Sequence, residues 1–288
     1  MWISDKWNDY ELLDCSDGEK LERWGKYILI RPEPQAIWKT KREHPGWERF
    51  DARYERSKTG GGKWSRNSLP EKWQIDYNDS KYSVSLMNFK HTGLFPEQAV
   101  NWEYIIKKIQ SEKAKAPERN IKVLNLFAYS GGATLAAAAA GATVCHVDAS
   151  KGMVSRAREN ARLSDLEDKP IRWIIDDCVA FINREKRRNR KYDVIIMDPP
   201  SFGRGPSGEV WKLETSLYDF VDLCKDILSD DPLFVLLNSY TTGLSPSTLS
   251  YITQSLLGGK AESRELGLPV TESGLILPCG ATCRLEFA

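Results

Sequence analysis

Two segments that are far apart in the chain constrain its fold more than any other feature. Asn125-Leu-Phe-Ala-Tyr-Ser-Gly-Gly132 closes the apolar run 121–126, and Asp198-Pro-Pro-Ser-Phe202 follows the apolar run 192–197. Ligands bind to open α/β sheets beyond the carboxyl ends of the strands, at the point where the strand order reverses. Two strand ends that carry small, polar and rigid residues therefore predict a cofactor cleft with a reacting group beside it.

Strand and helix patterns alternate regularly after Lys90, which is typical of a parallel sheet with helices on both faces. We expect an α/β domain over residues 91–288 with seven strands, most of them parallel. The predicted strands are 121–126, 143–147, 171–175, 194–197 and 233–237, with edge strands at 262–266 and 283–287. The predicted helices are 97–112, 133–140, 151–163, 179–187, 213–228 and 246–257.

The first 90 residues have a different composition and predict a small β-rich domain. They hold seven of the ten tryptophans, and 27–30 and 82–86 read as strands. Basic residues exceed acidic ones between 31 and 72 and alternate with Trp38, Trp47, Tyr54 and Trp64. This mixture suits base stacking and phosphate contacts, but it equally suits a small core of tryptophans under a solvated basic face. Both interpretations stay open at this point.

Composition excludes several classes of protein. The formal net charge is +1, so the charge of the whole chain requires neither nucleic acid nor a membrane surface. No apolar run approaches the length of a membrane span, and the N-terminus has no signal-peptide pattern. The six cysteines form no Cys-x-x-Cys pair, and there are only three histidines. We therefore expect a cytoplasmic protein with reduced thiols, no membrane partner and no metal.

The ends of the first two predicted strands carry residues suited to a nucleoside ligand. Gly131-Gly132 lets the backbone pass close to a ligand where a Cβ atom would collide. Asp148 follows the next strand and is placed to accept both hydroxyls of a ribose. Ser150 can cap the helix that follows. Each residue also has a plain structural interpretation, as a tight turn or a helix cap.

The next two strand ends are acidic. Of Asp176 and Asp177, one carboxylate suits an adenine amino group and the other suits a helix cap, and we favour position 177 for the ligand because it lies further beyond the strand. In Asp198-Pro199-Pro200 the locked φ angles hold a carboxylate and carbonyls in one place beside the cofactor. The glycine-containing stretch 202–211 that follows is expected to be a substrate lid.

Together these segments resemble the class I S-adenosylmethionine-dependent methyltransferases, which have a Rossmann-like fold. The resemblance rests on the 125–132 turn, on Val147-Asp148-Ala-Ser150, Arg158-Glu-Asn160 and Asp177, and on Asp198-Pro-Pro-Ser-Phe202. It is strongest to the branch of bacterial large-subunit ribosomal RNA methyltransferases that act on cytosine C5 or guanine N7. Upstream, 91–98 is similar to that branch's Lys-Thr-Gly-Phe-Phe-x-Asp-Gln-Arg segment. It departs from it at His91 and Ala99.

The resemblance implies S-adenosylmethionine as the cofactor and assigns roles to particular residues. The 125–131 turn would hold its methionine part, Asp148 its ribose and Asp177 its adenine, while Phe95 and Gln98 would close over it. Asp198 would line the sulfonium side and face the acceptor, so that the catalytic residues would be Asp198, Pro199 and Pro200. The implied cofactor-binding residues are Phe95, Gln98, Asn125, Ala128, Tyr129, Ser130, Gly131, Asp148, Ala149, Ser150, Asp177, Cys178 and Asp198.

The same resemblance implies a base in RNA, most of all ribosomal RNA, as the acceptor. Methylation of cytosine C5 needs a thiolate that adds to the ring. The Asp198 loop carries no cysteine, and Cys178 and Cys279 read better as packing thiols, so we expect an acceptor other than cytosine C5. Two alternatives remain: a methyltransferase for a small molecule or a protein side chain, and a fold that binds RNA or a partner without catalysis.

Overall fold

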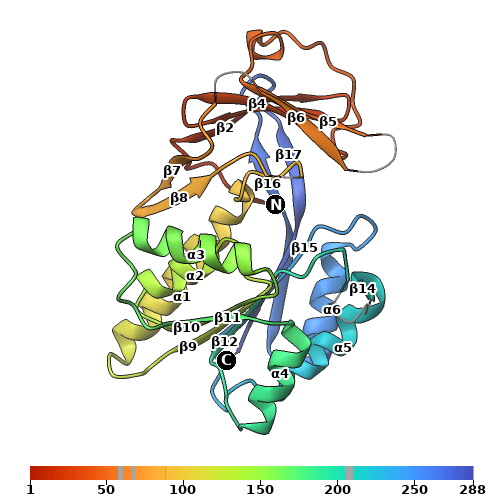
Figure 1. Ribbon diagram of the computed structural model, residues 1–288. Helices are drawn as coiled ribbons and strands as arrows, with labels where there is room; N and C mark the ends of the chain where they lie inside the picture. The colour runs from red at the N-terminus through yellow and green to blue at the C-terminus, as the bar shows by residue number, and fades with distance from the viewer. Residues whose placement is uncertain (58–60, 67–68, 88, 205–209, 288) are drawn as a thin grey trace. The chain divides into compact units, whose positions relative to one another are not determined.

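The computed structural model describes residues 1–57, 61–66, 69–87, 89–204 and 210–287 (Figure 1). It divides into two compact units. Unit 1 comprises Met1, Asn101–Glu265 and Gly280–Ala288, and unit 2 comprises Trp2–Val100 and Leu266–Cys279. The sequence places a boundary at residue 90 and assigns 266–279 to the larger part. As a division into functional domains, 1–90 and 91–288 stays a prediction.

Unit 1 contains the α/β sheet that the strand and helix patterns predict. Its strands lie in the order β17-β15-β12-β9-β10-β11, with β16 beside β17. All neighbouring pairs from β15 to β11 are parallel, and β17 is antiparallel to β15. The strands are β9 (Lys122–Leu126), β10 (Thr143–Asp148), β11 (Ile171–Ile175), β12 (Val194–Met197), β15 (Phe234–Ser239), β16 (Lys260–Pro269) and β17 (Ile276–Glu286). The chain order reverses between β9 and β12, which is where an open sheet binds its ligand.

Helices cover both faces of this sheet, with α1, α2 and α3 on one face and α4, α5 and α6 on the other (Figure 1). The helices are α1 (Ala99–Lys115), α2 (Gly132–Ala139), α3 (Lys151–Leu163), α4 (Cys178–Arg187), α5 (Leu213–Lys225) and α6 (Pro246–Leu257). The predicted helix 97–112 begins later than expected, because Pro96–Gln98 forms a separate 3-10 turn. The predicted helix 213–228 ends earlier, because Leu228 forms a bridge with Tyr192. Within the described residues no helix has the length and apolar character to cross a bilayer.

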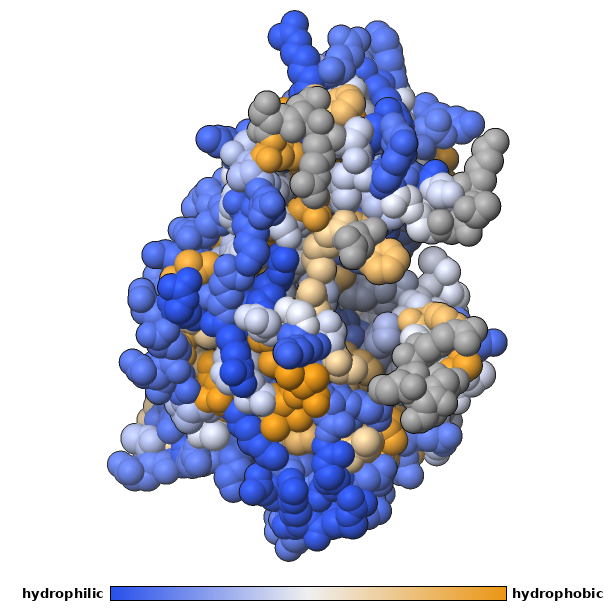
Figure 2. All heavy atoms as spheres, viewed as in Figure 1, coloured by the Kyte–Doolittle hydropathy of each residue, from blue (hydrophilic) through white to orange (hydrophobic). Residues whose placement is uncertain are grey.

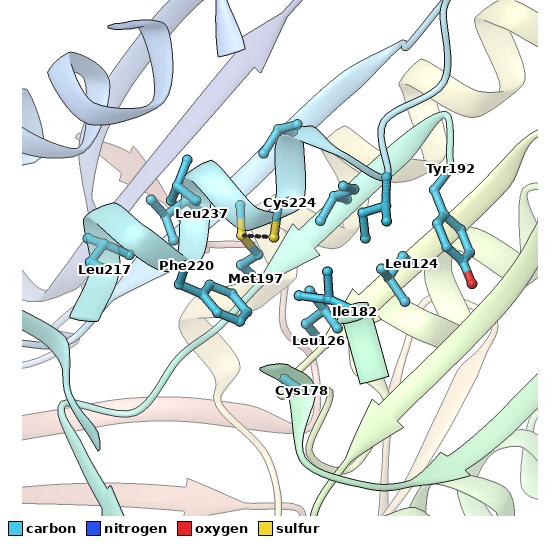
Figure 3. Close-up of a cluster of buried hydrophobic side chains, with 14 of the residues drawn as sticks. Leu124, Leu126, Cys178, Ile182, Tyr192, Met197, Leu217, Phe220, Cys224 and Leu237 are labelled. Atoms are coloured by element: carbon cyan, nitrogen blue, oxygen red, sulfur yellow. Dashed lines mark hydrogen bonds between the residues drawn. The ribbon is translucent and has the colours of Figure 1, made fainter. Parts of the chain in front are cut away.

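The main core of unit 1 lies between the sheet and the helices α4, α5 and α6. Successive side chains of a strand point to opposite faces. Leu124 and Leu126 of β9 therefore face this core, which also contains Phe220 of α5 (Figure 3). On the other face, the buried alanines 136–138 let α2 pack closely on the sheet, as the sequence predicts. Figure 2 shows hydrophilic side chains over most of the visible surface, with apolar ones in small clusters.

Unit 2 is the β-rich part that the N-terminal sequence predicts. Five strands lie in the order β2-β3-β4-β5-β6, β7 and β8 form a separate hairpin, and β1 pairs with β16 at Leu266 and Gly267. Because Leu266–Cys279 belongs to this unit, a distant part of the sequence completes it. The strands are β1 (Trp2–Ile3), β2 (Tyr10–Ser16), β3 (Glu19–Trp24), β4 (Tyr27–Pro32), β5 (Ala52–Arg56), β6 (Gly62–Arg66), β7 (Trp73–Tyr77) and β8 (Ser80–Val84). Pro45–Trp47 is a short 3-10 helix.

The tryptophans of unit 2 have structural partners. The indole N–H groups of Trp38 and Trp64 donate to backbone carbonyls. The indole N–H of Trp47 donates to the carboxylate of Asp14 at 2.7 Å. The guanidinium of Arg42 stacks on the Trp47 ring, 4.0 Å from its centroid. These contacts favour the structural interpretation of the tryptophans over a role as free stacking platforms.

Candidate active site

The four predicted strand ends come together at one edge of the unit 1 sheet. Parallel pairing places Leu126 beside both Val147 and Met197, and Asp148 beside Ile175. The turn after β9, the acids after β10 and β11, and the Asp198 turn after β12 therefore leave the sheet at similar heights. This edge includes the point where the strand order reverses, and we take it as the candidate active site.

The turn after β9 has a strained backbone. Phe127 and Tyr129 adopt positive φ angles of 54° and 49°, and Gly131 has a φ of 89°. A side chain in the left-handed region costs about 1–3 kcal/mol and persists only where the surroundings hold it. Strain of this kind concentrates at sites that bind ligands, because it holds backbone groups in directions that a relaxed turn would not give them.

Neighbouring elements hold this turn through its backbone. The N–H of Ala128 donates to the carbonyl of Val147 at 3.0 Å. The N–H of Phe127 donates to Sγ of Cys178 at 3.4 Å. The side-chain amide of Asn160, which is fully buried in α3, donates to the carbonyl of Ser130 at 2.9 Å. Contacts from β10, α3 and α4 thus fix successive residues of the turn.

Gly131 and Gly132 are required by packing within the protein. A Cβ atom on Gly131 would lie 2.9 Å from Cβ of Ala157, and one on Gly132 would lie 2.4 Å from the Trp102 ring. The close approaches that the structure shows at these glycines are to α3 and α1, and the close approach to a ligand stays a prediction. The glycines therefore let these two helices pack tightly against the turn.

Asp148 links two of the loops at this edge. Its Oδ2 accepts the N–H of Tyr129 and its Oδ1 accepts the N–H of Ser150, both at 2.8 Å. Burial raises the pKa of this carboxyl, while the two backbone donors oppose the shift. Each carboxylate oxygen has a second acceptor position, so the side chain can still receive hydroxyl donors. Ser150 caps α3 by accepting the N–H of Met153 at 3.4 Å, as expected, and Ala149 between them is exposed.

Asp176 and Asp177, which follow β11, make different contacts, and the sequence did not determine which of them caps α4. Asp177 is the N-cap of α4, and its Oδ1 accepts the N–H of Ala180 at 2.9 Å. Asp176 pairs with Arg184, and its Oδ1 accepts the N–H of Asp177. The helix cap therefore falls to Asp177, the residue predicted to bind adenine. Its adenine contact stays a prediction, for which Oδ2 of Asp177 is the oxygen not used by the cap.

Two apolar side chains beside these acids were missed by the sequence reasoning. Ile175, at the end of β11, is 52% exposed, and Val179, in the first turn of α4, is 37% exposed. A planar heterocycle with an amino group needs apolar contact on its faces and a hydrogen-bond acceptor at its edge, and apolar side chains beside a carboxylate offer both. The signal in the sequence was an isoleucine directly before Asp176, at a strand end where a polar residue would be expected.

The Asp198 turn is held by contacts on both sides. The N–H of Asp198 donates to the carbonyl of Leu126 at 3.3 Å. Ser201 accepts the Leu213 N–H through its carbonyl at 3.1 Å and the Thr241 hydroxyl through its Oγ at 2.7 Å. The chain then enters the hairpin of β13 (Phe202–Arg204) and β14 (Val210–Lys212). The predicted lid spans this hairpin, and residues 205–209, which include two of its three glycines, lie outside the described residues.

Other predicted site residues differ in their surroundings. Asn125 is only 2% exposed and donates to Oγ1 of Thr134 at 2.9 Å, and that oxygen also contacts Nδ1 of the buried His146. Its side chain therefore lies in the interior beneath the turn, and its cofactor contact stays a prediction. Phe95 and Gln98 belong to unit 2, so their closure over the cofactor also stays a prediction.

None of the six cysteines has the environment of a nucleophile. Burial raises the pKa of every one of them, to about 11 for Cys15 and Cys145 and further for Cys178. The thiolate is the reactive form of cysteine, so the raised pKa of each thiol disfavours its reactive form. Among the described residues no group of His, Cys, Asp and Glu side chains could hold a metal ion.

Comparisons with known proteins agree with this geometry. Residues 48–213 match the family model described as S-adenosylmethionine-dependent methyltransferase. A crystal structure of a SAM-dependent methyltransferase from Agrobacterium tumefaciens superposes with a TM-score of 0.90 at 38% identity, covering 99% of this chain and 93% of that one.

Among curated proteins, the chain is similar to enzymes named "Ribosomal RNA large subunit methyltransferase K/L". The protein from Colwellia psychrerythraea is 27% identical over 209 residues, which is 71% of this chain. The one from Shewanella loihica is 35% identical over 124 residues, which is 43% of this chain. The aligned part is only 25% and 16% of the length of these relatives.

Proposed function

Because the chain belongs to the S-adenosylmethionine-dependent methyltransferase family, we propose that it methylates a base in RNA, with ribosomal RNA as the expected substrate. The observation that carries the proposal is the alignment of 71% of the chain with an enzyme named as a large-subunit ribosomal RNA methyltransferase. Within this proposal, the rigid turn at Asp198 faces the acceptor that is brought to the cofactor. We also propose that the reaction takes place in the cytoplasm.

The residues at the strand ends fit the three parts of the cofactor. Asp148 has acceptor positions for the two ribose hydroxyls, and Asp177 has a carboxylate oxygen for the adenine amino group. Ile175 and Val179 offer apolar contact to the adenine ring. The strained turn from Phe127 to Gly131 presents backbone groups to the methionine part. Phe95 and Gln98, which belong to unit 2, stay predicted cofactor residues.

The bound cofactor supplies an already activated methyl group, so the protein has mainly to align the acceptor. The acceptor atom must approach in line at about 3 Å. A base inside a helix must first be flipped out of its stack. The raised pKa of all six thiols argues against covalent attack on cytosine C5, and it favours an acceptor that carries its own lone pair, such as a ring or exocyclic nitrogen.

Two measurements test the proposal in turn. Calorimetric titration of the purified full chain with S-adenosylhomocysteine should show saturable binding, and its absence would contradict the cofactor site. Mass spectrometry of ribosomal RNA nucleosides should show one methylated nucleoside missing from cells that lack the gene. The purified chain should restore that nucleoside in the RNA from those cells. An unchanged nucleoside profile would contradict the RNA substrate and favour a small molecule or a protein.

A further inference from the structure

Trp211 joins parts of unit 1 that the sequence separates widely. It lies in β14, and its indole Nε1 donates a hydrogen bond to the carbonyl of Pro200 at 2.6 Å. Its ring lies 5.5 Å from the ring of Phe127, in the strained turn after β9. The ring is also perpendicular to that of Phe220 in α5, at 5.5 Å. One side chain thus contacts the Asp198 turn, the cofactor turn and the core.

The contact with Pro200 has a particular effect because of the two prolines. Proline locks φ, but it leaves ψ free and has no N–H group to donate. The Asp198-Pro199-Pro200 turn therefore cannot be fixed through N–H groups of its prolines, and the direction of the Pro200 carbonyl depends on ψ. If the indole N–H of Trp211 is held in one place, its hydrogen bond to the Pro200 carbonyl fixes ψ of Pro200 and therefore the direction of the chain into Ser201.

Aromatic packing holds the indole ring of Trp211 in position. Phe220 belongs to the core around Met197 and Cys224 (Figure 3), and Phe127 and Trp211 pack against that core. Phe127 and Phe220 also contact each other, with ring centroids 5.4 Å apart. The indole is therefore held by two aromatic rings, one of which belongs to the cofactor turn.

We propose that Trp211 is a positioning residue for methyl transfer, which acts through Pro200 to hold Asp198 at a set place relative to the cofactor turn. The inference goes beyond the proposed function by assigning a role to a residue outside both predicted motifs. It rests on that proposal only for the statement that Asp198 faces the acceptor. Trp211 itself need not touch the cofactor or the acceptor.

The substitution Trp211→Phe keeps an aromatic ring between Phe127 and Phe220 but removes the N–H donor. We expect kcat for methyl transfer to RNA from cells lacking the gene to fall about two- to tenfold, the range for one neutral hydrogen bond. KM for S-adenosylmethionine should stay within about twofold, since the other cofactor contacts remain. The matched control is Trp173→Phe in β11, a partly buried tryptophan of the same unit that packs on His146. It should leave both constants unchanged.

Hydrogen exchange gives a readout that needs no substrate. In the Trp211→Phe variant, amides of the 198–204 segment should exchange about two- to tenfold faster than in the wild type, while Trp173→Phe leaves them unchanged. Unchanged exchange in this segment, or an equal change in both variants, would overturn the positioning role. If the wild type methylates no RNA, the RNA proposal fails and the exchange measurement alone decides the role of Trp211.

Discussion

Replacing Asp148 by asparagine removes one charge and one acceptor oxygen while keeping the size of the side chain. The carboxylate accepts two backbone N–H groups at 2.8 Å, from Tyr129 and Ser150. An asparagine side chain has a single acceptor oxygen, so one of these N–H groups must face an amide NH₂ group instead. The substitution therefore acts on the link between two loops and on the proposed ribose contact at once.

The structure sets the size of both effects. The two N–H groups are part-buried at Tyr129 and exposed at Ser150, so losing one of these hydrogen bonds costs about 0.5–1.5 kcal/mol in the free energy of unfolding. Losing one hydrogen bond from a ribose hydroxyl to a charged acceptor costs about 1.5–3 kcal/mol. Since 1.4 kcal/mol corresponds to a tenfold change in affinity, the Kd for S-adenosylhomocysteine should rise about 10- to 150-fold. Calorimetric titration at pH 7.5 measures it, and thermal unfolding measures the stability.

Asp193→Asn provides the control. Asp193 also accepts a backbone N–H, from Lys122 at 2.8 Å, and it lies before β12, at the opposite end of the strand from Asp198. Asp193 also accepts the Ser229 hydroxyl and pairs with Arg119, so Asp193→Asn should lose at least as much stability as Asp148→Asn and keep the wild-type Kd. If Asp148→Asn binds the ligand as tightly as the wild type, the ribose assignment is wrong. If both variants lose the same affinity, the effect on binding is only a consequence of stability.

Two further predictions concern buried titratable groups. Burial, reinforced by the charge of Arg158, lowers the pKa of His146 from 6.5 to about 3. As the pH falls, the imidazole is therefore protonated in the unfolded chain before it is protonated in the folded chain. The neutral buried imidazole contributes its full stability above pH 6.5, and this contribution is lost as the pH falls towards 3. The free energy of unfolding should therefore fall about 2 kcal/mol more between pH 7.5 and pH 5 in the wild type than in His146→Gln, and parallel curves from denaturant titrations would refute a neutral buried imidazole. Cys279→Ala should transfer methyl groups at a rate within about twofold of the wild type, because burial raises the pKa of this thiol; a thousandfold loss would instead identify Cys279 as a covalent catalyst.

The fold was predictable because its signals are local. Each strand of the parallel sheet is a short apolar run, and three of these runs end at or just before an acid, namely Asp148, Asp176 and Asp198. The helices between them have regular apolar spacing. Helix boundaries were less accurate where a short-range contact intervenes, as at Pro96–Gln98. The assignment of 266–279 to the β-rich unit could not be read from the sequence, because pairing between Trp2 and Leu266 leaves no local pattern.

The candidate site was predictable as a set of strand ends but not as a set of contacts. The sequence placed Asp148 and Asp198 correctly at strand ends, since their positions after strands follow from chain order, and their roles stay predictions. It could not tell which of Asp176 and Asp177 caps α4, because the two differ only in side-chain rotamer and helix phase. It placed Trp211 only at the end of a predicted lid and not as a positioning residue, because that role depends on a tertiary hydrogen bond to a proline carbonyl.

The use of Leu266–Cys279 by unit 2 has a consequence for how the chain acquires its structure during synthesis. The backbone N–H groups of Thr271 and Glu272 donate to carbonyls of Leu12 and Leu13, and the Thr271 hydroxyl donates to Glu11. None of these partners exists when the first hundred residues leave the ribosome. Chain synthesis proceeds at about 5–20 residues per second, so residues 266–279 are added on the order of ten seconds or more after the N-terminal strands. A fragment ending at Val100 would never form these contacts, so part of β2 would lack the hydrogen bonds that it makes with Thr271 and Glu272.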